Sequence, residues 1–407
     1  MKVLLIASGI GKTSEEVRSS FIFDEAFRLA RRGLEVHIVR GRFTREDGEV
    51  SYSMYFYGLG RKKYIGVVHA FFSTIGAYPL RSLIRSPKAI YFESLYATRA
   101  LEVAKKVRLD IIHAHFAYPE GLVGCMVKKR VGKPLIVTVH GYDILVEPSV
   151  GYGIRLSKRY DLLVRKVLNC ADAIICNSKA LYDEVLKVVN NEDVAKLIYH
   201  GVDLKMFTPM DKNIARARLN LPVNKHVIFT AKHHWPQYGI EYLIKSIPEV
   251  VSKVGDVLFV IGGDGPLRAF HESLARSLGV SDYVIFVGQI PRELMPYYYA
   301  SSDIVVVPSL QESWGLVATE AMASARPVIA SNVGGLREQV IDGFNGFLVP
   351  PRDPKAIADR ILYFLENPSE IEKMGLNGRR LAEERFDIEK RIDKILEVYA
   401  SINRRNP

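Results

Sequence analysis

Residues 226–261 read HVIFTAKHHWPQYGIEYLIKSIPEVVSKVGDVLFVI. Two apolar runs, His226–Thr230 and Val257–Ile261, enclose a stretch that is long enough for a helix. Neither run alternates apolar with polar residues, which is typical of strands buried on both faces of a parallel sheet. A strand, a helix and a second strand at this spacing therefore predict a parallel sheet covered by helices.

The same alternation extends along the chain on both sides of this segment. The further buried-type runs are Val3–Ala7, Glu35–Val39, Ile111–Ala114, Leu135–Val139, Ala173–Cys176, Lys196–Tyr199, Val284–Val287, Ile304–Val307 and Pro327–Ala330. The pattern stops at His200–Pro209 and then begins again. This restart indicates two doubly wound Rossmann-like domains rather than one large sheet.

We therefore predict an α/β protein with two Rossmann-like domains facing across a cleft. The N-terminal domain is expected at residues 1–205 and the C-terminal domain at 206–380. Residues 381–407 are expected to form a helix that packs back on the N-terminal domain, because the last part of the chain reads as helical throughout. Doubly wound sheets bind ligands at the carboxyl ends of their strands, so we expect the chemistry in the loops there.

The composition limits the class of protein. The chain has 407 residues, of which 48% are apolar and 25% charged, and this excludes disordered and fibrous proteins. The three cysteines, Cys125, Cys170 and Cys176, do not form paired metal-ligand motifs, and unpaired thiols suit a reducing cytoplasm. The longest uncharged stretch, residues 65–80, is shorter than the ~20 apolar residues of a membrane-spanning helix. We expect a cytoplasmic protein without such a helix.

The net charge of +11 lies entirely in the first half of the chain. Residues 1–205 contain 32 Lys and Arg against 21 Asp and Glu, whereas the remainder contains 24 of each. Aromatic and basic residues also alternate between Tyr52 and Arg99, a composition that suits the surface of an anionic membrane. We expect peripheral binding to the inner face of the membrane, although a charge that serves only solubility would give the same count. No nucleic-acid-binding module is recognisable.

Two carboxylates flank a possible anion site. Glu312 follows the strand Ile304–Val307, and Glu320 lies eight residues later in the sequence ESWGLVATE. A helix that begins near Ser313, with Gly315 beside its start, presents free backbone N–H groups, which bind phosphate. Carboxylates repel phosphate but accept hydrogen bonds from pairs of sugar hydroxyls, so the pattern points to a sugar nucleotide. Glu312 would then hold the transferred sugar and Glu320 the ribose, whereas a surface helix with solvated glutamates is the alternative.

This stretch resembles the E-x7-E signature of the retaining glycosyltransferases of family 4, the glycosyl transferases group 1. Other matching segments, in order, are Gly262-Gly-Asp-Gly-Pro266, Ile285-Phe-Val-Gly288, Ala300–Ser309, Pro327-Val-Ile-Ala330, Gly334-Gly335 with Glu338, and Gly343-Phe-Asn-Gly-Phe-Leu348. The resemblance covers nearly all of residues 226–385 and, more loosely, the N-terminal half. It implies the GT-B fold and transfer of a sugar from a nucleotide donor.

The resemblance also assigns a cation to the donor's diphosphate. Family members usually carry an Arg where this chain has Lys232, and a Lys where it has Tyr238. One of the two usual cations is therefore missing. Either His233 or His234 replaces it, or the diphosphate depends more strongly on Lys232.

In the first half, the resemblance implies that His140 contacts the transferred sugar. His140 follows the strand Leu135–Val139 and precedes Asp143 by three residues. His113 and His115 also lie at a strand end, but no third ligand is evident in the sequence, so we expect no metal site. These two histidines are instead expected to form part of the acceptor side.

Glycine-rich loops complete the expected site. Gly9 and Gly11 follow the first strand, where a flexible backbone can approach a ligand, but the spacing is not that of a P-loop. We predict His140, Lys232 and Glu312 as catalytic residues. The predicted substrate-binding residues are Gly9, Gly11, Gly263, Asp264, Trp314, Gly315, Leu316, Val317 and Glu320.

The sequence therefore predicts a retaining glycosyltransferase that moves a hexose from a UDP- or GDP-hexose to an acceptor hydroxyl, with no cofactor and no metal. The acceptor is expected to be a sugar or a lipid-linked saccharide. Two alternatives remain at this point. One is another GT-B enzyme, such as a sugar-nucleotide epimerase, and the other is a non-catalytic protein that binds nucleotide sugars.

Overall fold

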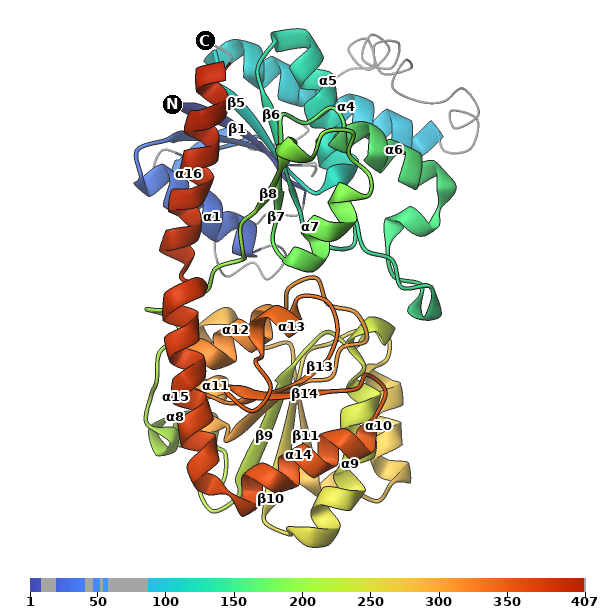
Figure 1. Cartoon of the computed structure of the whole chain (residues 1–407), viewed down its shortest axis with the longest axis vertical. Coiled ribbons are helices and arrows are strands. Elements are labelled where there is room, and N and C mark those ends of the chain that lie inside the picture. Colours follow the sequence, from blue (N-terminus) through green and yellow to red (C-terminus); the bar gives the residue numbers. More distant parts are fainter. Residues whose placement is uncertain (9–19, 41–46, 52–53, 58–86, 406–407) are drawn as a thin grey trace. The chain divides into compact units, whose positions relative to one another are not determined.

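The computed structural model describes residues 1–8, 20–40, 47–51, 54–57 and 87–405 (Figure 1). The chain forms two compact units, Met1–Ile198 with Ile392–Pro407, and Tyr199–Arg391. These boundaries differ from those expected at 205/206 and 380/381. Val202 and Phe207 are buried in the core of the second unit, so the connecting segment belongs there and not to the first unit.

The first unit contains an eight-stranded sheet in the order β3-β4-β2-β1-β5-β6-β7-β8. Its strands are β1 Lys2–Ile6, β2 Glu35–Val39, β3 Asp47–Ser51, β4 Met54–Tyr57, β5 Ile111–His115, β6 Leu135–Val139, β7 Ala173–Cys176 and β8 Ala195–Leu197. All neighbouring strands are parallel except β3, which runs antiparallel to β4. The hairpin β3–β4 was not among the expected strands: β3, Asp-Gly-Glu-Val-Ser, lacks an apolar run, and the aromatic run of β4, Met-Tyr-Phe-Tyr, was assigned to the basic and aromatic segment between Tyr52 and Arg99.

Helices cover both faces of this sheet. They are α1 Ser20–Arg31, α4 Pro87–Val107, α5 Leu122–Val131, α6 Lys158–Leu168, α7 Lys179–Leu186 and α16 Ile388–Arg405. Alternate residues of β1 point to opposite faces: Leu4 belongs to the core that includes residues of α4, α5 and α6, whereas Leu5 belongs to the core that includes residues of α1 and α16. The C-terminal part of α16 buries Ile392, Ile395 and Tyr399 in the core of the first unit.

The second unit has a six-stranded parallel sheet in the order β11-β10-β9-β12-β13-β14. Its strands are β9 His226–Ala231, β10 Val257–Gly262, β11 Val284–Gly288, β12 Ile304–Val307, β13 Val328–Ser331 and β14 Gly346–Val349. Successive strands first extend the sheet from β9 to β11 and then return to β12, on the other side of β9. The strand order thus reverses between β9 and β12, the place where doubly wound sheets bind ligands.

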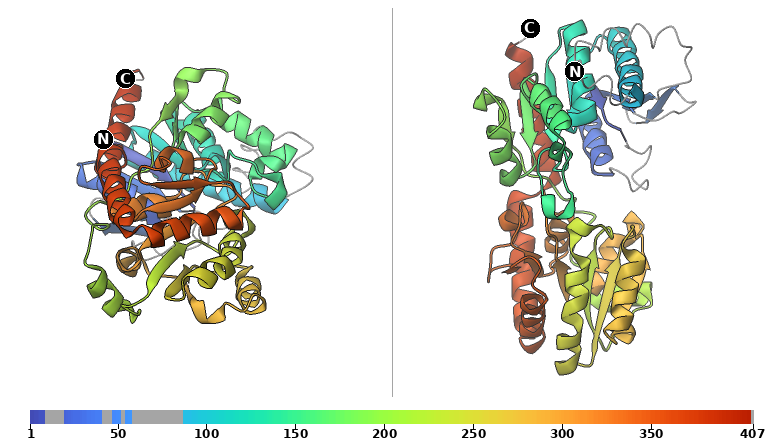
Figure 2. Two further views of the ribbon diagram at one scale, coloured as in Figure 1. Left: turned by 60° about the horizontal axis from the view of Figure 1, so that its bottom comes forward. Right: turned by 90° about the vertical axis from the view of Figure 1, so that its right-hand side faces the viewer.

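Two layers of helices enclose this second sheet (Figure 2). The helices are α8 Lys212–Leu219, α9 Ile240–Lys253, α10 Arg268–Ser277, α11 Met295–Ser301, α12 Leu316–Ala323, α13 Leu336–Gln339, α14 Pro354–Glu366 and α15 Pro368–Arg385. Phe229 packs in the layer that contains α12, and its neighbour Ile228 packs against α9 and α14. Within the described ranges, no helix is both long and apolar enough to cross a membrane.

Candidate functional site

Lys232 and Glu312 meet at the reversal point of the second sheet. Lys232 follows β9 and Glu312 follows β12, and these strands are neighbours, so their carboxyl ends bring the two side chains together. Lys232 Nζ forms an ion pair with Glu312 Oε2, which also accepts a hydrogen bond from Ser309 Oγ at 3.0 Å. Only 7% of the Lys232 side chain and 11% of the Glu312 side chain are exposed. The charges are therefore held largely away from bulk water.

The aromatic ring of Tyr238 lies beside the same cation. Its centroid is 5.2 Å from Lys232 Nζ, within the range of a cation–π contact. Burial, and next the nearby charge of Glu312, raise the pKa of Tyr238, so its phenol stays neutral at physiological pH. Tyr238 thus contributes no positive charge at the place where the resemblance implies a lysine.

The helix α12 begins at the predicted anion site. Gly315 has φ of +102° and directly precedes Leu316, the first residue of the helix. The first intrahelical hydrogen bonds come from Ala318 N and Thr319 N to Gly315 O, as expected for a helix whose first N–H groups have no intrahelical acceptor. The amides of Gly315, Leu316 and Val317 are therefore placed where they could bind an anion.

Trp314 lies in the core. Its indole is 3% exposed and packs against Tyr199 and Phe386, with ring centroids 5.3 and 5.1 Å away. The expectation that Trp314 binds substrate does not fit this position for its side chain. The residues next to Trp314 in the sequence do not reveal that its indole is buried.

Glu320 is held by a buried tyrosine. The hydroxyl of Tyr299, on α11, donates a hydrogen bond of 2.7 Å to Glu320 Oε2. Burial, reinforced by the charge of Glu320, raises the pKa of Tyr299, so the hydroxyl keeps its proton. The carboxylate consequently has a fixed donor on one of its two oxygens.

Two glycines let neighbouring loops approach the site residues. A Cβ atom on Gly334 would lie 1.8 Å from the main-chain oxygen of Glu312, and one on Gly263 would lie 2.0 Å from that of Lys232. Both glycines have positive φ. Asp264, also predicted to bind substrate, is exposed, and its carboxylate accepts a hydrogen bond from Gly265 N at 2.8 Å.

His234 is not the missing cation. It is buried against His271, and their Nδ1 atoms are 2.9 Å apart. Burial lowers the pKa of each histidine to about 4, so both rings are neutral near pH 7. His233, which is exposed, is therefore the one histidine of the two that could replace the absent lysine. The alternative is that the diphosphate depends more strongly on Lys232.

Acid is expected to destabilise the second unit through this histidine pair. An unfolded histidine has a pKa near 6.5, so the unfolded chain binds more protons than the folded chain as the pH falls from 6.5 to about 4. The free energy of unfolding should fall by about 2–3 kcal/mol per histidine over this range. Urea unfolding between pH 7.5 and 4.5 should show this loss, and His271→Phe should reduce it. His226→Gln is the control, and an equally steep loss in His271→Phe would contradict the assignment.

In the first unit, His140 lies at the carboxyl end of β6. Phe116 and Phe21 pack on its ring, with centroids 4.4 and 5.1 Å away. The buried Asp143 accepts hydrogen bonds from the main-chain N–H groups of His140 and Gly141, at 3.0 and 2.9 Å. Burial raises the pKa of Asp143 despite these bonds. Asp143 thus shapes the loop that carries His140.

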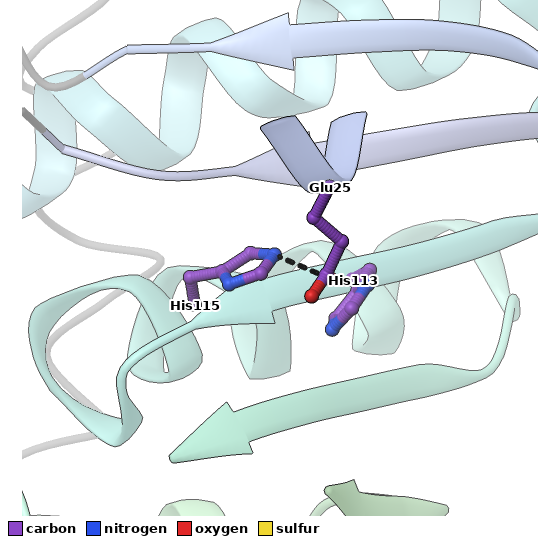
Figure 3. Close-up of side chains that lie close together, drawn as sticks. All are labelled: Glu25, His113 and His115. Carbon is purple, nitrogen blue, oxygen red and sulfur yellow. Dashed lines mark ion pairs between the residues drawn. The ribbon is translucent and has the colours of Figure 1, made fainter. Parts of the chain in front are cut away.

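His113 and His115, on β5, lie beside Glu25 of α1 (Figure 3). One potential ligand atom from each residue lies within 4.8 Å of the other two, which brings together a third candidate ligand that the sequence spacing did not reveal. However, the nitrogens of His113 already face the hydroxyls of Tyr399 and Thr138, at 2.6 and 2.7 Å. A cation would have to displace these hydrogen bonds.

The loop after β1 falls partly outside the described residues. Gly9 and Gly11, both predicted to bind substrate, belong to that part. The preceding residue, Ser8, donates hydrogen bonds to Glu120 from its backbone N, at 2.9 Å, and from its hydroxyl. Burial raises the pKa of Glu120 to about 7.

Comparison with known proteins gives the family. Residues 211–381 match the model of the Glycosyl transferases group 1, and residues 19–206 match that of Glycosyltransferase Family 4. The D-inositol 3-phosphate glycosyltransferase of Mycobacteroides abscessus is 30% identical over 84% of this chain and 75% of its own length. The chain belongs to the group 1 glycosyltransferases. The N-acetyl-α-D-glucosaminyl L-malate synthase of Bacillus anthracis is 24% identical over 93% and 92% of the two chains.

Solved structures show that this glycosyltransferase has the GT-B fold. Sucrose-phosphate synthase from Thermosynechococcus elongatus superimposes with a TM-score of 0.81 and 25% identity over 98% of both chains. Anabaena HepE, crystallised with UDP-glucose, gives a TM-score of 0.77 and 22% identity over 98% and 100%. The two doubly wound units predicted from the strand pattern are thus those of a known transferase fold.

Sequence reasoning missed four residues that position the predicted site of this glycosyltransferase. Ser309 and Tyr299 hold the two carboxylates, whereas Asn177 and Glu25 belong to the surroundings of His140. Of these four residues, only Ser309 could have been recognised in the sequence, because it follows a predicted strand and precedes Glu312 by three residues. The other three lie 21 to 115 residues from the groups they support, and only the packing of separate elements brings them close.

Proposed function

We propose that this glycosyltransferase transfers a hexose from a UDP- or GDP-hexose to an acceptor hydroxyl with retention of configuration. The ion pair of Lys232 with Glu312, at the strand reversal and beside the start of α12, is the observation that carries the proposal. A cation and free amides suit the departing diphosphate, and a carboxylate suits the hydroxyls of the sugar. Donor and acceptor specificity are parts of the proposal.

In the proposed reaction, the leaving group receives most of the electrostatic support. Lys232 and the amides of Gly315–Val317 neutralise the charge that develops on the diphosphate. A lysine ammonium has three N–H donors, and in the described part of the chain Lys232 Nζ donates only to Glu312. Donors therefore remain for a phosphate. Glu320 would bind the ribose with the oxygens that Tyr299 orients.

Retention requires either a covalent intermediate on a carboxylate or attack from the face of the leaving group. Glu312 Oε2 already accepts hydrogen bonds from Lys232 and Ser309, which makes this oxygen a weak nucleophile. We therefore favour front-face attack assisted by the leaving phosphate, with Glu312 orienting the sugar. The structure of Anabaena HepE with UDP-glucose supports a UDP-hexose as donor.

The proposal is tested with a panel of UDP-, GDP- and ADP-sugars. Titration calorimetry identifies the nucleotide, and NMR of the product with and without acceptors identifies the reaction and the anomeric configuration. An epimerase would convert the donor alone, and a non-catalytic protein would bind without turnover. Because the carboxylates are assigned to hydroxyls, transfer should persist in EDTA. Activity that EDTA abolishes and Mg²⁺ or Mn²⁺ restores would overturn the metal-free mechanism.

Glu320→Ala is expected to weaken donor binding more than it slows transfer. The residue contacts the ribose, which does not react, so its loss should raise the donor Kd by about tenfold while kcat changes less. Calorimetry and initial rates measure the two quantities. Tyr299→Phe keeps the packing but removes the 2.7 Å hydrogen bond, and it should show the same trend with a smaller effect. Equal losses of kcat in both variants would contradict the ribose assignment.

We also propose a lipid-linked or saccharide acceptor at an anionic membrane surface. The support is the excess of eleven positive charges in residues 1–205. Anionic vesicles should sediment the protein, and about 0.5 M salt should release it, because the attraction decays over a Debye length of roughly 8–10 Å at physiological salt. Reversing the charges of Arg61, Lys62 and Lys63, which lie outside the described residues, should weaken binding. Equal sedimentation with neutral vesicles would contradict this proposal.

A further inference from the structure

Polar side chains form a continuous row beneath His140. Asn177 follows β7, His140 follows β6 and His115 ends β5, and these three strands are neighbours in the sheet. Asn177 Nδ2 is 3.2 Å from His140 Nδ1, and His140 Nε2 is 3.1 Å from His115 Nδ1. His115 Nε2 faces Glu25 Oε1, on α1, at 3.4 Å. The row therefore runs from an amide through two imidazoles to a carboxylate.

The main-chain oxygen of Val139 sets the direction of this row. It is 3.0 Å from Asn177 Nδ2. A carbonyl oxygen can only accept, so the atom of Asn177 that faces it must be the amide nitrogen, not the amide oxygen. The same nitrogen faces His140 Nδ1 and therefore donates to it.

The donor at Asn177 determines which nitrogen is protonated in each of the two histidine rings. His140 Nδ1 accepts, so the neutral ring carries its proton on Nε2 and donates it to His115 Nδ1. His115 in turn carries its proton on Nε2, on the side of the Glu25 carboxylate, whose Oε1 is 3.4 Å away without hydrogen-bond geometry in this structure. The contacts of His140 with Asn177 and with His115 then each have one donor and one acceptor, and the other tautomer of either ring would place two donors or two acceptors together.

We infer that His115 and Glu25 are positioning residues that act through His140, by fixing its ring in the Nε2-protonated tautomer. The His115 side chain is fully buried, and 4% of the Glu25 side chain is exposed. Water therefore does not readily replace either side chain in the row. The role in transfer rests on the proposed function and on the contact of His140 with the transferred sugar that the family resemblance implies.

The tautomer can be read without any assay of transfer. The full-length chain labelled with ¹⁵N-histidine distinguishes protonated from unprotonated imidazole nitrogens by NMR, and the spectra of His140→Gln and His115→Gln assign the signals. We expect protonated Nε2 and unprotonated Nδ1 in both His140 and His115. A wild-type His140 that carries its proton on Nδ1 would overturn the inference, even if the protein proves to be an active transferase.

Variants at the end of the row test the positioning role. Glu25→Gln keeps an oxygen that can accept from His115, so the tautomer and kcat should stay close to wild type. Glu25→Leu removes the acceptor and should lower kcat by about 10- to 100-fold, with a smaller change in the donor KM and mixed tautomers of His140. His37→Phe is the control, since His37 is buried in the same unit and faces another carboxylate, Glu35, at 2.8 Å.

The most decisive test reverses the direction of the hydrogen bonds along the row. Asn177→Asp replaces the donor by an acceptor and should move the His140 proton to Nδ1, with a loss of kcat. Combining it with Glu25→Gln supplies a donor at the other end, so both rings should adopt the opposite tautomer. Should Asn177→Asp fail to fold, the comparison of Glu25→Leu with Glu25→Gln decides alone: equal tautomers and equal kcat in these two variants would overturn the inference.

Discussion

Glu312→Gln is expected to lower kcat by about 10²–10³ while the shape of the side chain is kept. The substitution removes the charge that pairs with Lys232 and that orients the sugar. In the wild type the carboxylate accepts from both Lys232 and Ser309, so its orientation is set before the donor binds. The loss should therefore appear in the chemical step, and single-turnover rates with saturating donor are the measurement.

The control for this variant is the same substitution in an exposed ion pair. Glu249 pairs with Lys253 on α9 at 3.4 Å, and 35% of the Glu249 side chain is exposed. Glu249→Gln should leave kcat within about twofold of the wild type, because an exposed ion pair contributes little. Thermal melts of both variants separate lost activity from lost folding. A folded Glu312→Gln enzyme with wild-type turnover would refute the assignment of Glu312 to the transferred sugar.

Gly334→Ala should have the second large effect, although Gly334 carries no functional group. The added Cβ would lie 1.8 Å from the main-chain oxygen of Glu312, so one of the two loops must move. The φ of +44° is also unfavourable for alanine. We expect a loss of about 2–4 kcal/mol in unfolding free energy and a fall in kcat/KM of about tenfold or more, because Glu312 is displaced.

Gly343→Ala separates these two causes. Gly343 also has a positive φ, +74°, but a Cβ there would meet nothing within 4 Å. This control carries the cost of the left-handed backbone, about 1–2 kcal/mol, without the collision. Urea unfolding and initial rates for both variants give the comparison. If Gly334→Ala behaves like Gly343→Ala, the contact with the Glu312 loop does not control the position of the carboxylate.

The sequence alone was sufficient for the strands that are buried on both faces. The runs around residues 3–7, 135–139, 226–230 and 304–307 are mostly apolar, and each is a strand in the structure. The hairpin β3–β4 was missed because β3 is polar and because the short aromatic run of β4 lies in a segment that was interpreted as a basic and aromatic surface. The unit boundaries were misplaced by several residues, because the connecting segment and the start of α16 pack on the second unit.

The chain sequence by itself determined the alternation of strands and helices, the charge excess of residues 1–205, and the spacing of Glu312 and Glu320 on either side of a helix start. These features depend on neighbours in the chain, and apolar runs and glycines signal them locally. Only the tertiary structure decided that Lys232 pairs with Glu312, that Tyr299 holds Glu320, and that Glu25 and Asn177 stand at the two ends of the row through His140. Such contacts join residues far apart in the sequence, and they arise because the carboxyl ends of adjacent parallel strands meet at one edge of a sheet, whatever the length of chain between them.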